Sequence, residues 1–203
     1  MKPVQIYCMG LQDRSDRVRW LLEELNVPYE NHFLKKAQGE MNSPEYRKLN
    51  PMGRVPTVID DGTTLFESVG ICLHLADKYG AGKMAPQGTG KDRAEYLQWM
   101  VFSVGSLECV VAKMFTLNGK TDAQKQEILQ FVKEQCEILK KPLNETLSRQ
   151  DYLLSSGFSA ADIMMAAVIP GARDYLMEPG SPIERYMQRL MERPAAIKVK
   201  VFE

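Results

Sequence analysis

The sequence predicts a small α/β domain followed by an all-helical domain. Over the first part of the chain, period-two and helical patterns of apolar residues alternate, as they do in α/β units. The segment 80–90 then contains four glycines and a proline, which is typical of a linker. Beyond it, the apolar residues follow helical spacing only. We therefore expect an α/β domain over residues 1–79, a linker over 80–90 and a helical domain over 91–203.

The first predicted elements are a strand and a helix. Apolar residues alternate with other residues from Val4 to Cys8, which indicates a strand. Apolar residues then recur at helical spacing and would lie on one face of a helix. They are Val18, Leu21, Leu22 and Leu25. The helix would be capped at its start by Asp13, Ser15 or Asp16, and would end before Pro28.

A second strand, a short helix, a hairpin and a longer helix complete the α/β domain. We expect the strand at Tyr29–Leu34, and the short helix near Pro44, because proline fits the first turn of a helix. The short apolar runs 57–59 and 64–66 are joined by a segment that contains Asp61-Gly62, a strong hairpin signal. A helix would begin at Ser68, which is suited to the N-cap position.

Helical patterns fill the rest of the chain. The expected segments are 92–114, 122–147, 159–177 and a last helix that opens at Ser181-Pro182 and ends at Arg193-Pro194. Pro142 and Pro170 fall inside two of them and would interrupt or bend the helix. The segment from Ser159 to Asp162 precedes an apolar run and predicts a capping box at the start of a buried helix.

Composition excludes several classes of protein. Twenty-six basic residues balance twenty-six acidic ones, so no overall field favours nucleic acid or an anionic membrane. The N-terminus lacks the long apolar region of a signal peptide, and no apolar run approaches the roughly 20 residues that a membrane helix needs. The four cysteines are scattered, without metal-ligand spacing. We expect a cytoplasmic protein without a metal site.

Two short segments carry candidate chemistry. In the first, Pro56 stands at the start of a strand, where proline loses no needed hydrogen bond. Alternatively, a cis Val55-Pro56 bond would turn the backbone groups of Val55 towards an extended peptide, although most such bonds are trans. In the second, Ser68 would cap a helix. With Glu67 it could instead hold the ammonium and carboxylate groups of an amino acid or peptide.

The order and spacing of several motifs together resemble the glutathione transferase superfamily over nearly the whole chain. The most specific stretch runs from Asn50-Pro-Met-Gly-Arg-Val-Pro-Thr-Val through Asp61-Gly62 to Leu65-Phe-Glu-Ser68. Supporting matches are Arg17-Val-Arg-Trp-Leu-Leu-Glu-Glu-Leu, Ser43-Pro-Glu-Tyr46, Phe158-Ser-Ala-Ala-Asp162 and Arg193-Pro-Ala195. The resemblance implies a thioredoxin-like N-terminal domain, an all-helical C-terminal domain, a homodimer and glutathione as co-substrate.

The resemblance also implies a role for particular residues in binding glutathione. Val55, before a cis Pro56, would pair with the cysteinyl backbone of glutathione, and Glu67 and Ser68 would contact its γ-glutamyl end. Arg54 would contact the glycyl carboxylate or the peptide backbone. Met41 and Asn42 stand where some relatives carry histidine and lysine for that carboxylate, so we expect weaker recognition from that loop.

The catalytic residue is the point at which the sequence departs from the family pattern. Glutathione must react as a thiolate, and relatives stabilise the thiolate with a Tyr, Ser or Cys near the first helix. Ser15 matches a serine of bacterial and fungal relatives, with a role as a helix cap or first-turn residue as the alternative. Tyr7 is displaced by about one residue from the place of a catalytic tyrosine, and a packing role is favoured. Cys8 falls on the buried face of the strand.

The expected activity is conjugation of glutathione to small hydrophobic electrophiles. Glu108 and Phe115 are candidates for the pocket of that second substrate; a solvated or ion-paired helix face is the other interpretation of Glu108. Two alternatives stay open. One is a glutathione-dependent peroxidase or thiol transferase on the same fold, and the other is a non-catalytic interaction protein. The sequence does not identify the electrophile.

Overall fold

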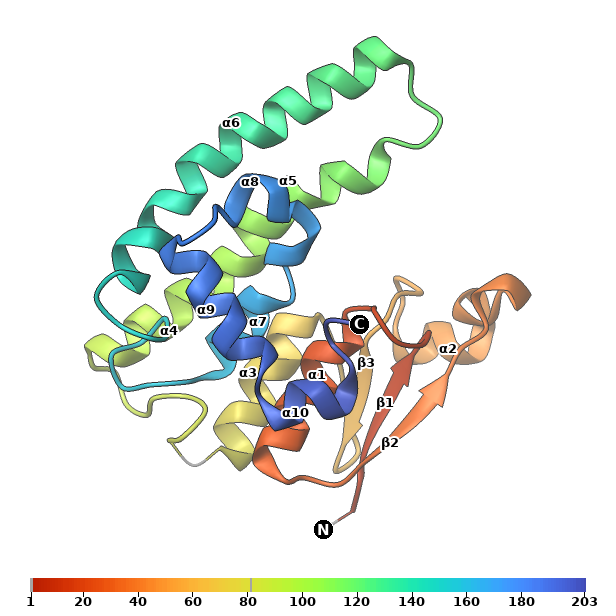
Figure 1. The fold of residues 1–203 in the computed structure, drawn as a ribbon. Helices are drawn as coiled ribbons and strands as arrows, with labels where there is room; N and C mark the ends of the chain where they lie inside the picture. Colours follow the sequence, from red (N-terminus) through yellow and green to blue (C-terminus); the bar gives the residue numbers. More distant parts are fainter. Residues whose placement is uncertain (1, 81) are drawn as a thin grey trace. The chain divides into compact units, whose positions relative to one another are not determined.

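The computed structural model describes residues 2–80 and 82–203 of the chain, which form two compact units (Figure 1). The first unit comprises the described residues up to Ala85 together with Glu192–Glu203, and the second comprises Pro86–Met191. The expected domains differ from these units at the end of the chain, because the structure groups the last twelve residues with the first unit.

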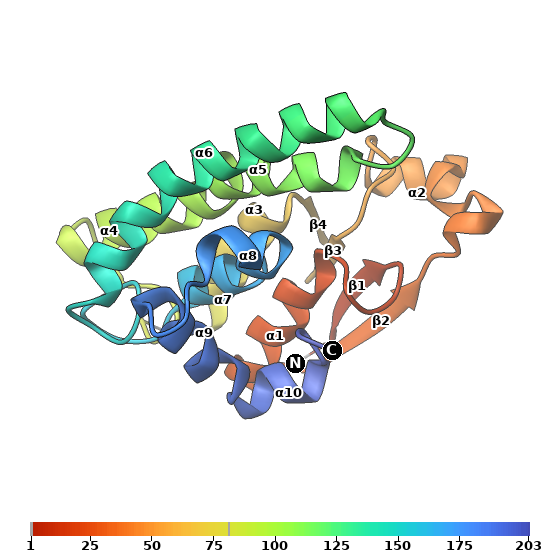
Figure 2. The same ribbon diagram turned by 45° about the horizontal axis from the view of Figure 1, so that its top comes forward.

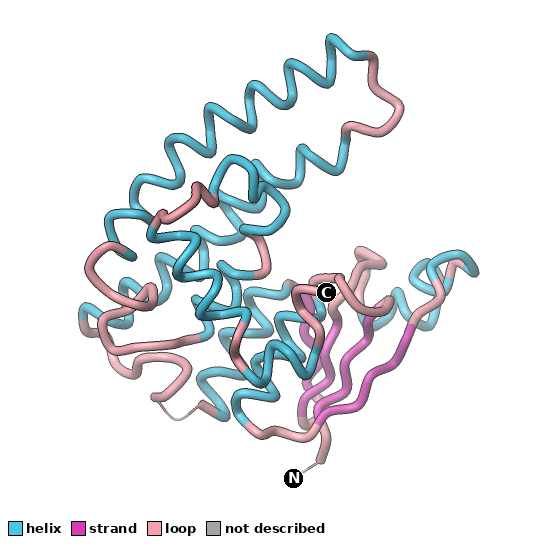
Figure 3. Tube along the Cα trace, viewed as in Figure 1, coloured by secondary structure: helices cyan, strands magenta, loops and turns pink. Residues whose placement is uncertain are grey.

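A four-stranded sheet forms the centre of the first unit (Figure 3). Its strands are β1 (Val4–Cys8), β2 (Tyr29–Phe33), β3 (Thr57–Asp60) and β4 (Thr63–Phe66), in the order β2-β1-β3-β4. β1 is parallel to β2 and antiparallel to β3, and β3 is antiparallel to β4. This mixed sheet with its helices is the thioredoxin-like arrangement that the resemblance implies, and the hairpin predicted from Asp61-Gly62 is confirmed.

Two helices cover one face of the sheet, α1 (Ser15–Leu25) and α3 (Ser68–Tyr79). The alternation in β1 and the helical spacing in α1 and α3 direct apolar side chains towards each other, and the core of the unit forms between them. The fully buried side chains include Ile6, Cys8, Val58, Val18, Leu21, Leu22, Ile71, Cys72 and Leu75. α2 (Pro44–Leu49) follows two single 3-10 turns, Lys36–Gln38 and Glu40–Asn42, and is capped by the Ser43 side chain.

The end of the chain forms a helix that the sequence analysis did not predict. α9 (Pro182–Met191) ends before Arg193-Pro194, and α10 (Pro194–Val199) begins there. α10 packs on α1, and the Arg193 guanidinium donates two hydrogen bonds of 2.7 Å to the Glu24 carboxylate. The Phe202 ring meets Trp20 edge to face. These contacts explain why the segment belongs to the first unit.

The second unit is helical, as expected. A continuous helical segment from Lys91 to Thr116 runs beside the long helix α6 (Figures 1 and 2). The segment consists of α4 (Lys91–Val101), a π-helical stretch (Phe102–Leu107), α5 (Glu108–Val111) and a 3-10 stretch (Ala112–Thr116). The remaining helices are α6 (Asp122–Leu147), α7 (Ala160–Ala166), a 3-10 turn (Ile169–Ala172), α8 (Arg173–Leu176) and α9.

The two internal prolines behave differently. α6 continues through Pro142, which is exposed, so of the two expected outcomes, an interruption or a bend, the interruption is absent. The segment around Pro170 does break, into α7, a 3-10 turn and α8. The capping box predicted at Ser159 and Asp162 is confirmed: the Ser159 hydroxyl accepts from the N–H of Ala161, and Asp162 accepts from the N–H of Ser159 at 2.8 Å.

The segment Lys91–Thr116 is long and apolar enough, by length and composition alone, to cross a membrane. The sequence analysis did not identify it, because charged residues interrupt its apolar run at several positions. Its parts pack on α6 and α7 inside the second unit, and a third of its most apolar window is buried. The segment is therefore a partly buried helix of that unit.

Candidate functional site

The register of the sheet brings three separate segments to one end of the first unit. Tyr7 near the end of β1 lies opposite Thr57 at the start of β3, and Thr57 lies opposite Phe66 at the end of β4. The loop after β1, the segment before β3 and the start of α3 therefore lie at the same end of the sheet. The guanidinium of Arg17 in α1 donates to the Ser68 hydroxyl at 3.2 Å, which joins the starts of α1 and α3.

Asp13 organises the loop that follows β1. One of its carboxylate oxygens accepts from the backbone N–H groups of Met9 at 2.8 Å and Gly10 at 3.2 Å. The other accepts from the N–H of Ser15 at 2.6 Å, and the carbonyl of Asp13 accepts from the N–H of Asp16. None of the three expected candidates is the N-cap of α1: Arg14 occupies that position without a side-chain hydrogen bond, and Asp13, one residue earlier, accepts from the N–H of the first helical residue.

A buried ion pair in α1 also fixes the loop after β1. Asp16 and Arg19 are both buried and bonded to each other. Arg19 also donates to the carbonyl of Gly10 at 2.6 Å, and Asp16 accepts from the N–H of Gln12 at 2.7 Å. A charge pair removed from water is retained only with such additional hydrogen bonds. The pair therefore holds the backbone of the loop in one arrangement.

Ser15 is the first residue of α1 and does not cap it, in contrast to one of its expected roles. Its side chain is completely buried, and its hydroxyl has no hydrogen-bond partner in the described part of the chain. A buried polar group without a partner is costly, by about 1–3 kcal/mol. The hydroxyl thus retains its full capacity to donate a hydrogen bond at the start of a helix.

The other two catalytic candidates, Tyr7 and Cys8, pack against other side chains of the first unit. Tyr7 stacks on the His32 ring, with 4.8 Å between the ring centres, and lies near Tyr46. Cys8 is fully buried on the helix-covered face of the sheet. Burial raises the pKa of its thiol, although the nearby Arg19 guanidinium acts in the opposite direction. A thiol with a raised pKa and no exposure is a poor nucleophile.

A compact hydrogen-bond network shapes the segment before β3. The buried amide of Asn50 donates to the carbonyl of Arg54 at 2.8 Å and to the Thr57 hydroxyl at 3.1 Å. The Tyr46 hydroxyl donates to the same carbonyl at 2.6 Å. Gly53 has a φ of +60°, and a Cβ there would come within 2.6 Å of the carbonyl oxygen of Met41. This turn therefore requires glycine.

The network holds Val55 at one end of the sheet, just before β3. The Val55-Pro56 bond is cis, as the resemblance implies. Neither the N–H nor the C=O of Val55 has a hydrogen-bond partner among the described residues. The Arg54 side chain beside it is exposed. An extended peptide could therefore pair with Val55 as an added strand does.

Glu67 and Ser68 occupy places at the start of α3 that differ from the expected ones. Glu67, not Ser68, is at the N-cap position, and Ser68 is the first helical residue. Ser68 accepts the hydrogen bond from Arg17 instead of capping the helix. Glu67 has a φ of +71°, which is uncommon for a residue with a side chain. Its carboxylate is exposed and has no partner among the described residues.

The two candidates for the second-substrate pocket belong to the second unit. Glu108 is half-buried at the start of α5 and has an interaction partner within the protein. Phe115 is largely exposed. Exposed apolar side chains also flank the loop after β1 in the first unit, namely Met9, Leu11 and Phe33. The sequence analysis did not identify these three.

Several supporting residues were also missed: Asp13 as an organiser of the loop, Arg17, Arg19, Tyr46 and Asn50. A signal existed for the two arginines, because they stand two apart in an otherwise strongly amphipathic helix and cannot both point to solvent. No such signal marks Asn50, whose partners are backbone and hydroxyl groups several residues away. Among residues 2–80 and 82–203, no group of three or more His, Cys, Asp or Glu is placed to hold a metal ion.

Comparisons with known proteins cover most of the chain. The family model described as the glutathione S-transferase N-terminal domain matches residues 2–77, and the model of the C-terminal domain matches residues 106–194. Glutathione S-transferase 3 of Schizosaccharomyces pombe is 34% identical over 90% of this chain and 81% of its own length. Glutathione S-transferase GstB of Escherichia coli is 27% identical, over 90% of each chain.

Solved structures agree with these matches. Glutathione transferase URE2P6 of Phanerochaete chrysosporium, in complex with oxidized glutathione, has a TM-score of 0.82 and 27% identity, and the match covers 98% of this chain and 95% of that one. URE2P8 of the same fungus, also with oxidized glutathione, has a TM-score of 0.84 and 25% identity, over 98% and 94% of the two chains.

Proposed function

Because this chain belongs to the glutathione S-transferase family, we propose that it is a glutathione transferase that conjugates the glutathione thiolate to small hydrophobic electrophiles. One observation carries the proposal. Three segments at the same end of the sheet have polar groups without a partner in the described chain. These groups are the hydroxyl of Ser15, the backbone of Val55 and the carboxylate of Glu67. Solved relatives with oxidized glutathione support glutathione as the ligand.

Glutathione would bind across these segments. The N–H and C=O of Val55 would pair with the cysteinyl backbone of the peptide. Glu67 would hold the ammonium group of the γ-glutamyl end, and the start of α3 at Ser68 would receive its carboxylate, since a helix N-terminus favours an anion. Arg54 would contact the glycyl carboxylate. Pro56 orients the strand behind these contacts.

The reaction requires a thiolate at neutral pH, and a free thiol with a pKa near 8.5 is only a few per cent ionised there. The hydroxyl of Ser15 would donate a hydrogen bond to the sulfur and lower its pKa. The N–H groups of Ser15 and Asp16 are already bonded to Asp13, so they are less suited to this role. Since the Ser15 hydroxyl is covered in this structure, the atoms above it must shift when glutathione binds.

The conjugation step forms a bond between the glutathione sulfur and an electrophilic carbon of the second substrate. The electron pair of the broken bond leaves with the leaving group, and the proton of the thiol passes to solvent. Glu108 and Phe115 of the second unit are the candidates to contact that substrate.

The two alternatives are less well supported by the site. A peroxidase or thiol transferase that used Cys8 would need an accessible thiolate, whereas Cys8 is buried and the pKa of its thiol is raised. A non-catalytic interaction protein would have no need of an exposed Glu67 at a positive φ, because strained backbone persists at sites of function. We further propose that the protein is cytoplasmic and forms a homodimer.

The test is the affinity for glutathione of the natural protein and of Glu67→Gln, measured by calorimetry and by retention on immobilised glutathione. We expect Glu67→Gln to weaken binding by about tenfold, because a charged hydrogen bond to the ammonium is lost. Glu30→Gln is the matched control: Glu30 is equally exposed but pairs with Gln5, towards the other end of β1, and its change should leave the affinity unaltered.

Failure of the natural protein to bind glutathione at millimolar concentration would overturn the proposal. If the protein bound glutathione but did not conjugate it to an activated aryl chloride at any pH at which it is folded, the result would favour a non-catalytic interaction protein. Loss of a thiol-transfer activity in Cys8→Ser, with the fold intact, would favour the peroxidase or thiol transferase.

A further inference from the structure

A buried arginine joins the starts of two helices in the first unit. Arg17 in α1 is 3% exposed, and Ser68, the first residue of α3, is 7% exposed. The guanidinium of Arg17 donates to the hydroxyl oxygen of Ser68 at 3.2 Å. Arg17 also has a further interaction within the protein. The guanidinium is therefore held in one place beside the start of α3.

The environment of Cys72 shows on which side of α3 this charge lies. Cys72 is one helical turn after Ser68 and is fully buried. Burial raises the pKa of its thiol to about 12, whereas the positive charge of Arg17 acts in the opposite direction. Because Arg17 acts on both residues, its charge lies on the buried side of the first turn of α3. A ligand at the start of α3 would therefore contact Ser68 rather than Arg17.

The bond from Arg17 determines what the Ser68 hydroxyl can still do. A serine hydroxyl has one proton to donate and two lone pairs that accept. The Arg17 guanidinium occupies a lone pair, and the hydroxyl proton has no acceptor among the described residues. Since a hydroxyl does not point its proton at a group that donates to it, the proton turns away from Arg17. Ser68 is thus a donor whose direction is set by a buried cation.

The backbone at the start of α3 has unused donors as well. Glu67 is at the N-cap position, and its side chain does not cap the helix. The N–H groups of Ser68, Val69 and Gly70 have no partner among the described residues. Such N–H groups and the positive end of the helix dipole favour an anion. Together with the Ser68 hydroxyl, they form a set of donors that lacks an acceptor in the described part of the protein.

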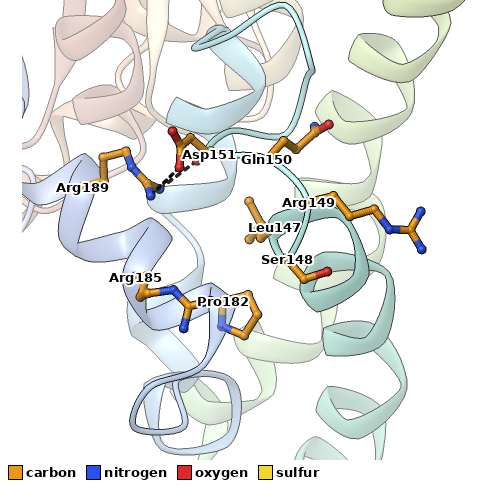
Figure 4. A pocket seen from close by; sticks show the side chains of 8 residues that line it. All are labelled: Leu147, Ser148, Arg149, Gln150, Asp151, Pro182, Arg185 and Arg189. Carbon is orange, nitrogen blue, oxygen red and sulfur yellow. Dashed lines mark hydrogen bonds and ion pairs between the residues drawn. The ribbon is translucent and has the colours of Figure 1, made fainter.

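An arginine in the second unit has a different kind of acceptor. In an open pocket between the end of α6 and the start of α9, Arg189 donates to the Asp151 carboxylate at 2.7 Å (Figure 4). That carboxylate already balances the charge of Arg189. Arg17 instead donates to a neutral hydroxyl, which keeps a proton for a ligand. We therefore expect an anion at the start of α3 rather than in that pocket.

We propose that Arg17 is a positioning residue for glutathione: by donating to the Ser68 oxygen, it directs the Ser68 proton to the α-carboxylate of the γ-glutamyl group. This inference rests on the proposed function, in which that carboxylate lies at the start of α3. Hydrogen bonds in a chain polarise one another, so a hydroxyl that accepts from a cation binds an anion more strongly. The contribution of Arg17 therefore depends on the carboxylate of the ligand.

The test compares glutathione with γ-aminobutyryl-cysteinylglycine, the same peptide without the α-carboxylate. This analogue keeps the ammonium group for Glu67. We expect Arg17→Met to weaken glutathione binding by about tenfold in calorimetry and to change the affinity for the analogue by less than about twofold. The KM for glutathione should rise by the same factor while kcat is retained, because the lost contact is equally strong in the ground state and the transition state. Equal weakening of both peptides would overturn the inference.

Ser68→Ala tests whether Arg17 acts through the hydroxyl. In the Ser68→Ala background, Arg17→Met should have no further effect on the affinity for glutathione, so the two changes should be non-additive. Additive effects would contradict the hydrogen-bond chain.

Arg19→Met is the matched control, because Arg19 is equally buried in α1 but pairs with Asp16. Any loss of affinity in this variant should be the same for both peptides. If Arg19→Met distinguished the two peptides as strongly as Arg17→Met does, the specific role of Arg17 would be contradicted.

Arg17→Lys is the second variant, for the case that Arg17→Met does not fold. It keeps a buried charge, but lysine lacks the fixed planar donors of arginine, so we expect glutathione binding to weaken by about threefold and the analogue to be unaffected. No loss, or a loss shared by both peptides, would overturn the inference.

The outcomes separate this inference from the proposed function. If the natural protein does not bind glutathione, both fail. If it binds glutathione and Glu67→Gln weakens the binding, but the variants of Arg17 do not distinguish the two peptides, only the role of Arg17 fails.

Discussion

At the scale of single residues, the candidate chemistry rests on Ser15, Val55 and Glu67. Each has polar atoms that the described protein does not satisfy, and the three come from different elements. The sequence resemblance identified all of them, but it could not show their state. The structure places Arg14 at the N-cap of α1 and Ser15 inside the helix, while Asp13 accepts from the N–H of Ser15. A sequence pattern cannot decide at which of several neighbouring residues a helix begins.

The first residue-scale prediction concerns Ser15→Ala. We expect kcat for conjugation at neutral pH to fall by about 100-fold, as it does when a single donor to a developing anion is removed. The pKa of the bound glutathione thiol should rise, so the activity should recover as the pH is raised. Steady-state kinetics and the ultraviolet absorbance of the thiolate as a function of pH measure both effects.

Stability provides the control for this prediction. Because the Ser15 hydroxyl has no partner in the described chain, its removal should not lower the unfolding midpoint in urea. An unchanged thiol pKa together with unchanged kcat would contradict the role of Ser15. In that case Tyr7 or the backbone of the loop after β1 would stabilise the thiolate.

At the scale of elements, helix starts are the features that matter most. The capping box of α7 was predictable, because its residues are close in sequence and each satisfies a backbone N–H of the other. The start of α3 was not, since the positive φ of Glu67 moves Ser68 one place into the helix, where Arg17 reaches it from α1. That contact spans fifty-one residues, beyond any local pattern.

Asp162 at the start of α7 gives a pH-dependent prediction. Burial raises the pKa of its carboxyl to about 6, against hydrogen bonds from the backbone of Leu153 and Ser159 and the hydroxyls of Ser159 and Tyr186. The folded protein therefore keeps this proton between the ordinary pKa of 3.8 and about 6, while the unfolded chain has lost it. This contribution to stability is complete below the lower value and is lost as the pH rises through the upper one.

We expect Asp162→Asn to remove this contribution, on the order of 2–3 kcal/mol, from the change in unfolding free energy between about pH 4 and about pH 7. Urea unfolding at several pH values measures it. Thr121→Ala is the matched control: Thr121 caps α6 in a similar capping box but does not contact Asp162, so its change should lower stability by about 1 kcal/mol throughout and keep the pH dependence. A pH profile identical in Asp162→Asn and the natural protein would contradict the raised pKa.

At the scale of the whole molecule, the chain consists of two units whose boundary the sequence predicted only in part. The glycine-rich linker marks the passage from the first to the second unit. The return of Glu192–Glu203 to the first unit depends on the Arg193–Glu24 ion pair and on the Trp20–Phe202 contact. Both join residues at opposite ends of the chain, so composition along the chain could not show them.

The proposed homodimer gives a prediction at this scale. Exposed large apolar side chains on α4 and α6 (Leu97, Val101, Phe131 and Ile138) suggest a surface that another copy covers. We expect the natural protein to sediment at twice the chain mass of 23.0 kDa. Val101→Glu should weaken the dimer by about 100-fold or more, because a charge would be buried without a partner.

Ile197→Glu is the control for that variant. Ile197 lies on α10 and is 58% exposed, against 59% for Val101, so the change in surface chemistry is matched. It should leave the dimer intact. A natural protein that sediments as a monomer at micromolar concentration, or equal effects of the two variants, would contradict the interface. Analytical ultracentrifugation distinguishes these outcomes.

The sequence by itself determined the elements and the family. The elements were predictable because periodicity, the Asp61-Gly62 turn and the capping box at Ser159 depend on residues close together in the sequence. The family was predictable because its motifs keep their spacing along the chain. Only the tertiary structure decided which polar groups are left without a partner. It left the hydroxyl of Ser15 and the carboxylate of Glu67 without a partner among the described residues, and it joined Arg17 to Ser68. Hydrogen bonds and charges are satisfied across the fold, between residues that no local pattern relates.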